Sequence, residues 1–205
     1  MQLRGEYNTE QLQTINAILS CLNDLCSPER EALEDKITSY LAFRREVDRF
    51  LAKHFSGLCT HRCYHSGESA CCSREGITTF FADVVVNLLV SPRKAIESLV
   101  SALSETGNEK CVYLSSEGCL WQVKPIVCEM FLCRHARDTV FGKRPDLLEA
   151  WRELRQREKR FTWPTRPVLF DELETFFMER GCHSSLMYFH NSPGLLRVKE
   201  THNVP

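Results

Sequence analysis

The residues with the clearest chemical potential in this chain are its cysteines. The sequence contains eleven, and eight of them lie between residues 59 and 133. Cysteine thiolates are soft ligands that select zinc, copper(I) or iron–sulfur clusters, and four that converge suffice for one ion or cluster. The eight occur in four short stretches: Cys59 and Cys63, Cys71 and Cys72, Cys111 and Cys119, and Cys128 and Cys133. We predict that they bind zinc or iron, the latter as an ion or a [4Fe-4S] cluster.

Disulfide bonding is the main alternative for so many cysteines. An odd number cannot pair fully within one chain, and the first residues lack the apolar stretch of a signal peptide. Disulfides are rare in reducing compartments, where clustered cysteines indicate metal or redox chemistry. No run of 18 apolar residues is present, so the sequence predicts no membrane span. We therefore expect a cytoplasmic metal-binding protein that does not act at a membrane.

Spacing limits how these thiols could share an ion. Cys59 and Cys63 would share one face of a helix, whereas Cys128 and Cys133, five residues apart, would not. The adjacent Cys71 and Cys72 point in different directions in any regular structure, so one could serve a second metal. We expect four to six true ligands, which leaves open two sites or one site with spare thiols.

Other residues near or outside this set have simpler interpretations. His61 and His65 lie between and beside the first cysteines and could ligate zinc, although loop histidines are more often exposed. Cys21, Cys26 and Cys182 are expected to act as small apolar residues. Asp83 is a candidate hydrogen-bond acceptor for a metal ligand, and the alternatives are that it caps a helix or faces solvent.

Several motifs with defined chemistry are absent. Radical enzymes that cleave S-adenosylmethionine require Cys-x3-Cys-x2-Cys, and Ser66 occupies the position of the third cysteine. Ferredoxin spacings, Cys-x2-Cys pairs, glycine-rich phosphate loops and His-Glu-x-x-His are also missing. The cysteines therefore indicate metal binding without a specific reaction.

The cluster resembles the YkgJ-type cysteine-cluster proteins, described as zinc- or iron-chelating domains with eight cysteines. The similarity covers about residues 59–133 and rests on the double cysteine at 71–72, Gly118-Cys119 and Pro125-x-x-Cys128, with Ile77, Asp83, Tyr113, Trp121 and Phe131 as supporting positions. The resemblance implies that all eight cysteines are candidate ligands. The chain departs from the family where its first cysteines are more widely spaced and where Glu129 replaces a common arginine. Related flagellin lysine methylases are longer, and no site for their cosubstrate is evident here.

The apolar pattern predicts a mainly α fold with loops that carry the metal site and a small C-terminal β-hairpin. Helices are expected from Thr9 to Leu22, from Ser27-Pro28 to a stop at Gly57, from Thr78 to Val90, from Ser91-Pro92 to Ser104, from Pro125 to Phe131, from Pro145 to Arg160 and from Pro167 to Arg180, with Gly181 as a left-handed terminator. Residues 58–76 are expected to form a loop. The hairpin is expected over 186–198, around the turn-forming residues 191–194.

Three regions are predicted: an N-terminal helical hairpin over 1–57, a cysteine-cluster metal-binding core over 58–135, and C-terminal helices with the β-hairpin over 136–205, packed as one unit. Whether the protein is an enzyme, redox or methylase-related, is left open. So is a role as an interaction module that uses the N-terminal helices to contact a protein partner. Residues 134–166 hold ten basic and five acidic residues. A charged helix of this kind usually faces solvent and forms ion pairs along its surface, so we expect no nucleic-acid partner.

Overall fold

The computed structural model describes residues 2–69, 71–72, 78–104, 110–162 and 167–187, with the side chains of 2–6 left out. Over these residues the fold is mainly helical, with one two-stranded antiparallel hairpin, as the sequence predicts for fold class. The elements are α1 (Gln2–Asp24), α2 (Ser27–Leu58), the π-helix η1 (Cys59–Tyr64), α3 (Phe81–Val90), α4 (Arg93–Ser104), β1 (Leu114–Ser115), β2 (Gly118–Cys119), α5 (Ile126–Glu129), α6 (Arg134–Phe141), α7 (Pro145–Thr162) and α8 (Leu169–Met178).

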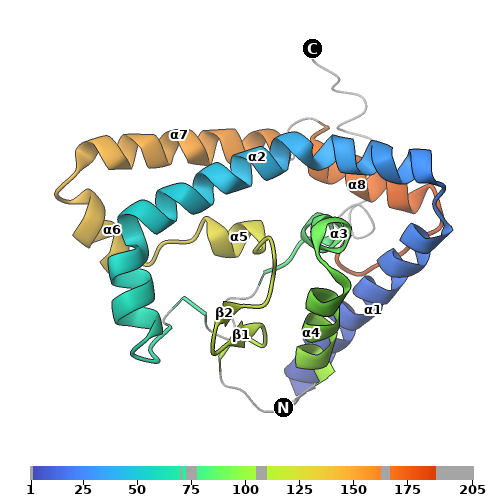
Figure 1. Ribbon diagram of the computed structural model, residues 1–205, viewed down its shortest axis with the longest axis horizontal. Helices are drawn as coiled ribbons and strands as arrows, with labels where there is room; N and C mark the ends of the chain where they lie inside the picture. The colour runs from blue at the N-terminus through green and yellow to red at the C-terminus, as the bar shows by residue number, and fades with distance from the viewer. Residues whose placement is uncertain (1, 70, 73–77, 105–109, 163–166, 188–205) are drawn as a thin grey trace.

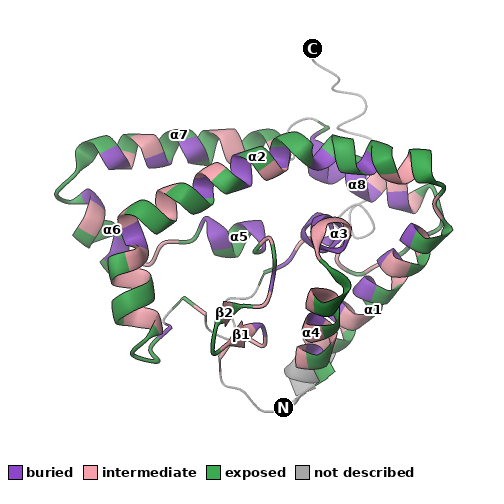
Figure 2. Cartoon of the chain, in the orientation of Figure 1, coloured by how far each residue is buried: buried purple, intermediate pink, exposed green. Residues whose placement is uncertain are grey.

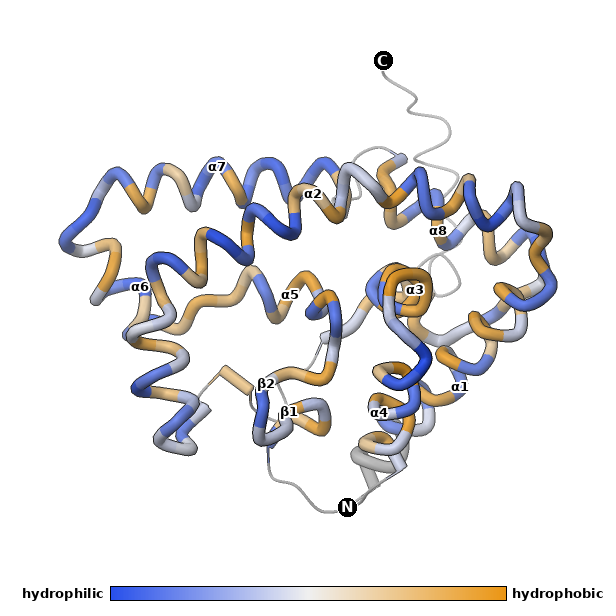
Figure 3. Tube along the Cα trace, viewed as in Figure 1, coloured by the Kyte–Doolittle hydropathy of each residue, from blue (hydrophilic) through white to orange (hydrophobic). Residues whose placement is uncertain are grey.

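The long helices α2 and α7 pack along one edge of the molecule, with α8 beside the end of α7 (Figure 1). Helix α3 lies near the middle and contacts both α1 and α8, while α1 also contacts α4. Helix α3 is largely apolar apart from Asp83 and Asn87, and residues 81–88 are all buried (Figures 2 and 3). One core cluster draws residues from all three predicted regions, and the division between those regions stays a prediction.

Helix α2 begins where the sequence predicts but ends differently. Cys26, rather than Ser27, is the N-cap residue, and its backbone N–H donates to the Glu29 carboxylate at 3.1 Å. The predicted stop at Gly57 is wrong, because the helix continues to Leu58 and then changes into η1. Glycine ends a helix readily when the chain turns left-handed, but Gly57 keeps a helical conformation. The expected loop over 58–76 therefore begins with a π-helix.

The other predicted boundaries hold in part. Thr9 lies inside α1, so its assignment as a helix cap is wrong. Helices α4 and α7 occur close to where they are predicted, and Gly181 follows α8 with a φ of +74° as expected. The predicted C-terminal hairpin falls largely on residues 188–205, outside the described residues, and Leu186 at its start lies in a turn. The hairpin β1–β2 and helix α6 were not predicted.

Most charged side chains of the basic helix α7 are exposed, but two of its arginines contact other parts of the chain. Arg157 makes two hydrogen bonds of 2.7 and 2.6 Å to the Glu46 carboxylate on α2, and Arg155 donates to the backbone carbonyl of Met130 at 3.2 Å. Leu147, Trp151 and Leu154 form its buried side. These two arginines therefore join α7 to α2 and to the segment that follows α5. In the part of the chain that is described, no helix is both long enough and apolar enough to cross a bilayer.

Candidate metal centre

The eight predicted ligand cysteines lie on elements that meet on one side of the molecule. Cys59 and Cys63 are on η1, at the end of α2, and Cys71 and Cys72 follow it. The other four are carried by the segment that contains the hairpin and α5: Cys111, Cys119, Cys128 and Cys133. These four stretches are therefore brought together by the fold, although they are distant in sequence.

Backbone and side-chain hydrogen bonds join the stretches directly. The backbone N–H of Cys111 donates to the carbonyl of Cys72 at 3.0 Å. Tyr64, the last residue of η1, donates from its hydroxyl to the carbonyl of Ser115 in β1 at 2.8 Å. The π-helix is thus attached to the hairpin, and the segment that precedes the hairpin is attached to the double cysteine.

The pKa of the Cys59 thiol on η1 is affected by thiols of two other stretches. Burial raises the pKa of the Cys59 thiol above its ordinary value, and negative charge on neighbouring thiols raises it further. Those neighbours are Cys71, Cys133 and Cys63. Cys59 therefore lies within electrostatic range of one thiol on its own stretch, Cys63, and of thiols on two other stretches, Cys71 and Cys133.

Burial and the charges of neighbouring thiols also raise the pKa values of the other four cysteines. Burial raises the pKa of Cys111 to about 11, with further contributions from the charges of Cys119 and Cys128. Burial also raises the pKa of Cys119, with Cys128 among the charges that oppose its ionisation. The pKa of Cys72 is raised mainly by its hydrogen bond to Cys71, and Cys111 and Cys119 add to the effect. Charge interactions thus link Cys111 and Cys119 to Cys72 and to Cys128, and Cys128 is also affected by the charge of Cys71.

The adjacent cysteines 71 and 72 are hydrogen-bonded to each other through their thiols. A hydrogen bond from the Cys72 thiol lowers the pKa of Cys71 to about 6, and positive charge from Lys124 and Lys110 favours the same thiolate. The same bond holds the proton on Cys72 and raises its pKa. Cys71 is exposed and Cys72 is half-buried. One member of the pair is therefore a thiolate at neutral pH, which is the form that binds metal.

Thiols that lie near one another do not by themselves form a metal site. Among the described residues, no three or more His, Cys, Asp or Glu side chains are arranged so that they could hold one metal ion. His61 and His65 are exposed, with ring centroids 5.5 Å apart on η1. The ligand assignment therefore remains a prediction, and the thiols would have to move closer together to bind an ion.

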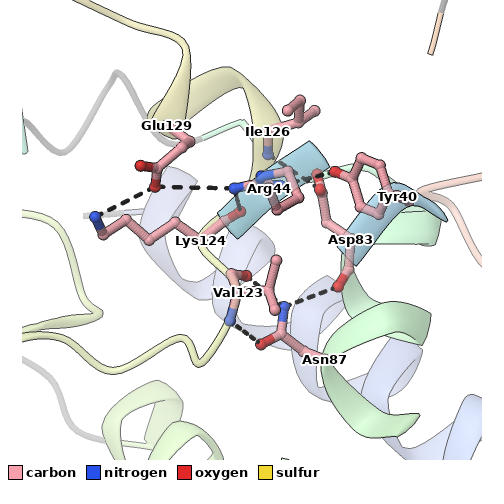
Figure 4. A network of polar contacts seen from close by, with 8 residues as sticks. All are labelled: Tyr40, Arg44, Asp83, Asn87, Val123, Lys124, Ile126 and Glu129. Carbon is pink, nitrogen blue, oxygen red and sulfur yellow. Dashed lines mark hydrogen bonds and ion pairs between the residues drawn. The ribbon is translucent and has the colours of Figure 1, made fainter. Parts of the chain in front are cut away.

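A buried polar network fixes the segment between Cys119 and Cys128 (Figure 4). We call Arg44, Asp83 and Asn87 the clamp. The Asn87 amide donates to the carbonyl of Val123 at 2.6 Å and accepts from its N–H at 2.9 Å. Asp83 accepts the N–H of Ile126 at 3.0 Å. Each of these backbone groups is thus held by a side chain of α3.

The third clamp residue extends the network to α2. Arg44 donates to the carbonyl of Lys124 at 2.6 Å and to the Tyr40 hydroxyl at 2.7 Å. Its guanidinium also lies 3.8 Å from the carboxylate of Glu129, which follows Cys128, and Lys124 pairs with the same carboxylate at 3.2 Å. Both Arg44 and Glu129 are buried. The segment that carries two predicted ligands is therefore attached to two core helices.

Asp83 has the role that the sequence left open. It caps α3, since the N–H of Phe80 donates to its carboxylate at 3.0 Å, and it is buried rather than facing solvent. Burial raises its pKa from an ordinary value near 3.8 to about 6. The folded protein therefore binds more protons than the unfolded chain between about pH 4 and 6, so this group's contribution to stability is present at low pH and is lost as the pH rises.

We expect Asp83→Asn to be destabilising by about 1–3 kcal/mol at pH 4.5, because an asparagine amide can accept from only one of the two N–H groups. At pH 7 the buried carboxylate of the unmodified protein is charged. The unfolding free energies of the variant and the unmodified protein should therefore differ by on the order of 2 kcal/mol less at pH 7 than at pH 4.5. Urea unfolding at both pH values measures this, with the exposed Asp24→Asn as control. A difference that widens with pH would show that the fold stabilises the charged carboxylate.

Sequence reasoning missed the clamp and the shape of the cysteine segments. One signal was available: Asp83 and Asn87 are the polar residues of a largely apolar helix, where buried polar side chains need partners. Glu129 gave no such signal. Its burial depends on Arg44, which is distant in sequence, and on Lys124, which is nearby in sequence. Outside the eight, Cys182 is buried as an apolar residue, whereas Cys26 is exposed, so the apolar interpretation is wrong for Cys26.

The resemblance that the cysteine pattern suggests gains no independent support from known proteins. Comparison of the chain with family models, with curated proteins and with solved structures gave no match in any of the three.

Proposed function

We propose that the protein binds zinc or iron through thiolates drawn from the eight cysteines between 59 and 133. The observation that carries the proposal is that four separated stretches place their thiols within electrostatic range of one another. Thiolates gathered in this way repel each other, and a cation removes that repulsion. The resemblance to cysteine-cluster proteins supports the same ligands.

The neighbours of each thiol suggest how the ligands divide. One set consists of Cys59, Cys63, Cys71 and Cys133. The other set consists of Cys72, Cys111, Cys119 and Cys128. Each set has the four thiols that a tetrahedral zinc or a [4Fe-4S] cluster needs. The double cysteine would give one ligand to each set, which requires the hydrogen bond between the Cys71 and Cys72 thiols to break on metal binding. We therefore propose two neighbouring centres that share the 71–72 backbone.

The surroundings favour a centre that exchanges its metal or takes part in a reaction over a closed structural centre. Cys71, Cys119 and Cys128 are exposed, so solvent reaches this side of the proposed centres. The clamp fixes the backbone between Cys119 and Cys128, which keeps part of the ligand set in place without metal. Metal handling, electron transfer or cluster-based catalysis in a reducing compartment would each fit such a centre.

Paired substitutions test the division into two sets. We expect Cys59→Ser/Cys63→Ser and Cys111→Ser/Cys119→Ser each to lower bound metal by about half, since each pair removes ligands from one centre. Combining the pairs should abolish binding. Metal per chain is measured by elemental analysis after anaerobic loading with zinc or with iron and sulfide.

Cys26→Ser is the matched control, because Cys26 is exposed but lies outside both sets. It should leave the metal content unchanged. Equal loss of all metal in either pair would favour one centre instead of two. Unchanged metal in the combined variant, with the helical circular dichroism retained, would contradict metal binding by these thiols.

A further inference from the structure

Two cysteines outside the proposed metal centres also meet. Cys21 lies in the last turns of α1, and Cys182 follows α8 near the other end of the described chain. Their thiols are hydrogen-bonded to one another. Cys182 belongs to the hydrophobic core cluster, and Cys21 packs against that cluster. Nothing in the proposed metal binding uses this pair.

Local structure holds Cys182 in this position. Gly181 adopts a left-handed φ of +74° and reverses the chain after α8. The N–H of Cys182 then donates to the carbonyl of Phe177 at 3.0 Å, which closes the helix end and fixes the backbone from which the thiol projects. The position of Cys182 is therefore set by the end of α8 and does not depend on the thiol contact.

A second contact keeps the same two segments together. The hydroxyls of Thr14 on α1 and Ser184 are hydrogen-bonded at 2.6 Å, and Thr14 is buried. Thr14 and Cys21 are seven residues apart, about two turns, so they lie on one face of α1. Two side chains of one helix face thus contact two residues of the segment after α8, which restricts the relative motion of the two sulfurs.

We propose that Cys21 and Cys182 form a reversible intramolecular disulfide when the protein meets a low-molecular-weight disulfide such as oxidised glutathione. Such a bond would join α1 to the end of α8, and so the beginning of the described chain to its far end. The two sulfurs would have to move from a hydrogen-bonding separation to the sulfur–sulfur bond length of about 2.0 Å, between segments already joined by the Thr14–Ser184 hydrogen bond.

The exchange proceeds in two steps with balanced electrons and protons. The half-buried Cys21 loses its proton, and its sulfur attacks one sulfur of the small disulfide, which breaks that disulfide and releases one thiol. The Cys182 sulfur, once deprotonated, attacks the Cys21 sulfur of the mixed disulfide and releases the second thiol. The two protons end on the two released thiols. Two protein thiols are oxidised, and one small disulfide is reduced.

The different exposure of the two residues sets their order. Cys21 is accessible enough to meet the small disulfide, while Cys182, at 4% exposure, is reached only from within the fold. Burial also raises the pKa of Cys182 to about 12, so its thiol is protonated at neutral pH and the second step is the slower one. The mixed disulfide at Cys21 should therefore accumulate briefly before the internal bond forms.

Peptide mapping of the full chain tests the proposal. The Cys26→Ser variant is oxidised with excess oxidised glutathione, the remaining thiols are alkylated, and the chain is cleaved with trypsin without reduction. Cleavage after Arg4 and Arg30 and after Arg180 and Arg197 gives peptides 5–30 and 181–197, each with one cysteine in this variant. We expect these two peptides to appear linked, and the link to disappear on reduction and in the further variant Cys21→Ser.

Thermal unfolding gives a second measurement that does not require replacing the buried Cys182. Oxidation should raise the melting temperature of Cys26→Ser by on the order of 5–10 °C, because the bond closes a very long loop, and it should not raise that of Cys21→Ser/Cys26→Ser. Recovery of both peptides fully alkylated after oxidation, or a link found only between two chains, would overturn the proposal.

Discussion

Replacing Arg44 with alanine is expected to lower the free energy of unfolding by about 3–5 kcal/mol, a larger loss than that expected for Asp83→Asn. The change would leave the buried carboxylate of Glu129 with Lys124 as its remaining cationic partner among the described residues. It would also remove the hydrogen bonds to Tyr40 and to the carbonyl of Lys124. Chemical denaturation followed by circular dichroism gives the measurement.

Matched variants separate the charge effect from loss of helix stability. Arg45→Ala changes the neighbouring residue of α2, whose side chain is exposed, and should cost less than about 1 kcal/mol. Arg44→Met with Glu129→Gln removes both charges, so it should recover much of the loss seen in Arg44→Ala. If Arg44→Ala were as mild as Arg45→Ala, the buried ion pair would not be a support of the fold.

Removing the metal that we propose is the second change for which a large effect is expected. Structural zinc in small peptides supplies on the order of 10–16 kcal/mol of apparent folding free energy. Here a hydrophobic core already joins the helices, so we expect chelation to loosen the cysteine segments while the helices persist. Metal loss should increase hydrogen exchange over 59–72 and 111–133 by at least about tenfold and leave α3 protected.

Hydrogen exchange with mass spectrometry on the metal-loaded and chelated protein provides the comparison. Helix α7 is an internal control, because it packs on α2 and α8 and carries no predicted ligand. Restoring zinc or iron with sulfide should restore protection in the two cysteine segments alone. Equal exchange in both states, or loosening of α7 as well, would contradict a centre confined to those segments.

The sequence predicted the elements that local signals determine. The capping residues and prolines before α4 and α7, and the glycine after α8, act within one or two turns, so a pattern of a few residues is sufficient. The failures occurred where tertiary contacts decide. Gly57 is compatible with both a stop and a continued helix, and the two-residue strands of the hairpin are too short to show alternation.

The residues of the candidate centre could be proposed from the sequence but their geometry could not, and the ligand assignment stays a prediction. Eight clustered cysteines indicate the region of the proposed centre, because unpaired thiols in such number are typical of metal or redox sites. Their division into two sets depends on how η1 and the hairpin approach each other, which no spacing rule gives. The clamp was also hidden, since Arg44 reaches a carbonyl 80 residues away in sequence. Contacts of that range follow from the packing of α2 against the segment after the hairpin.

Anaerobic purification followed by absorbance spectroscopy and elemental analysis tests metal binding by these thiols most directly. We predict stoichiometric metal in one of two forms: a coloured protein with iron and acid-labile sulfide, or a colourless one with zinc. In either form the metal should protect the cysteines of 59–133 from alkylation, while Cys26 reacts. A protein that emerges without metal, takes up neither zinc nor iron, and exposes all eight thiols to alkylation would contradict the proposed function.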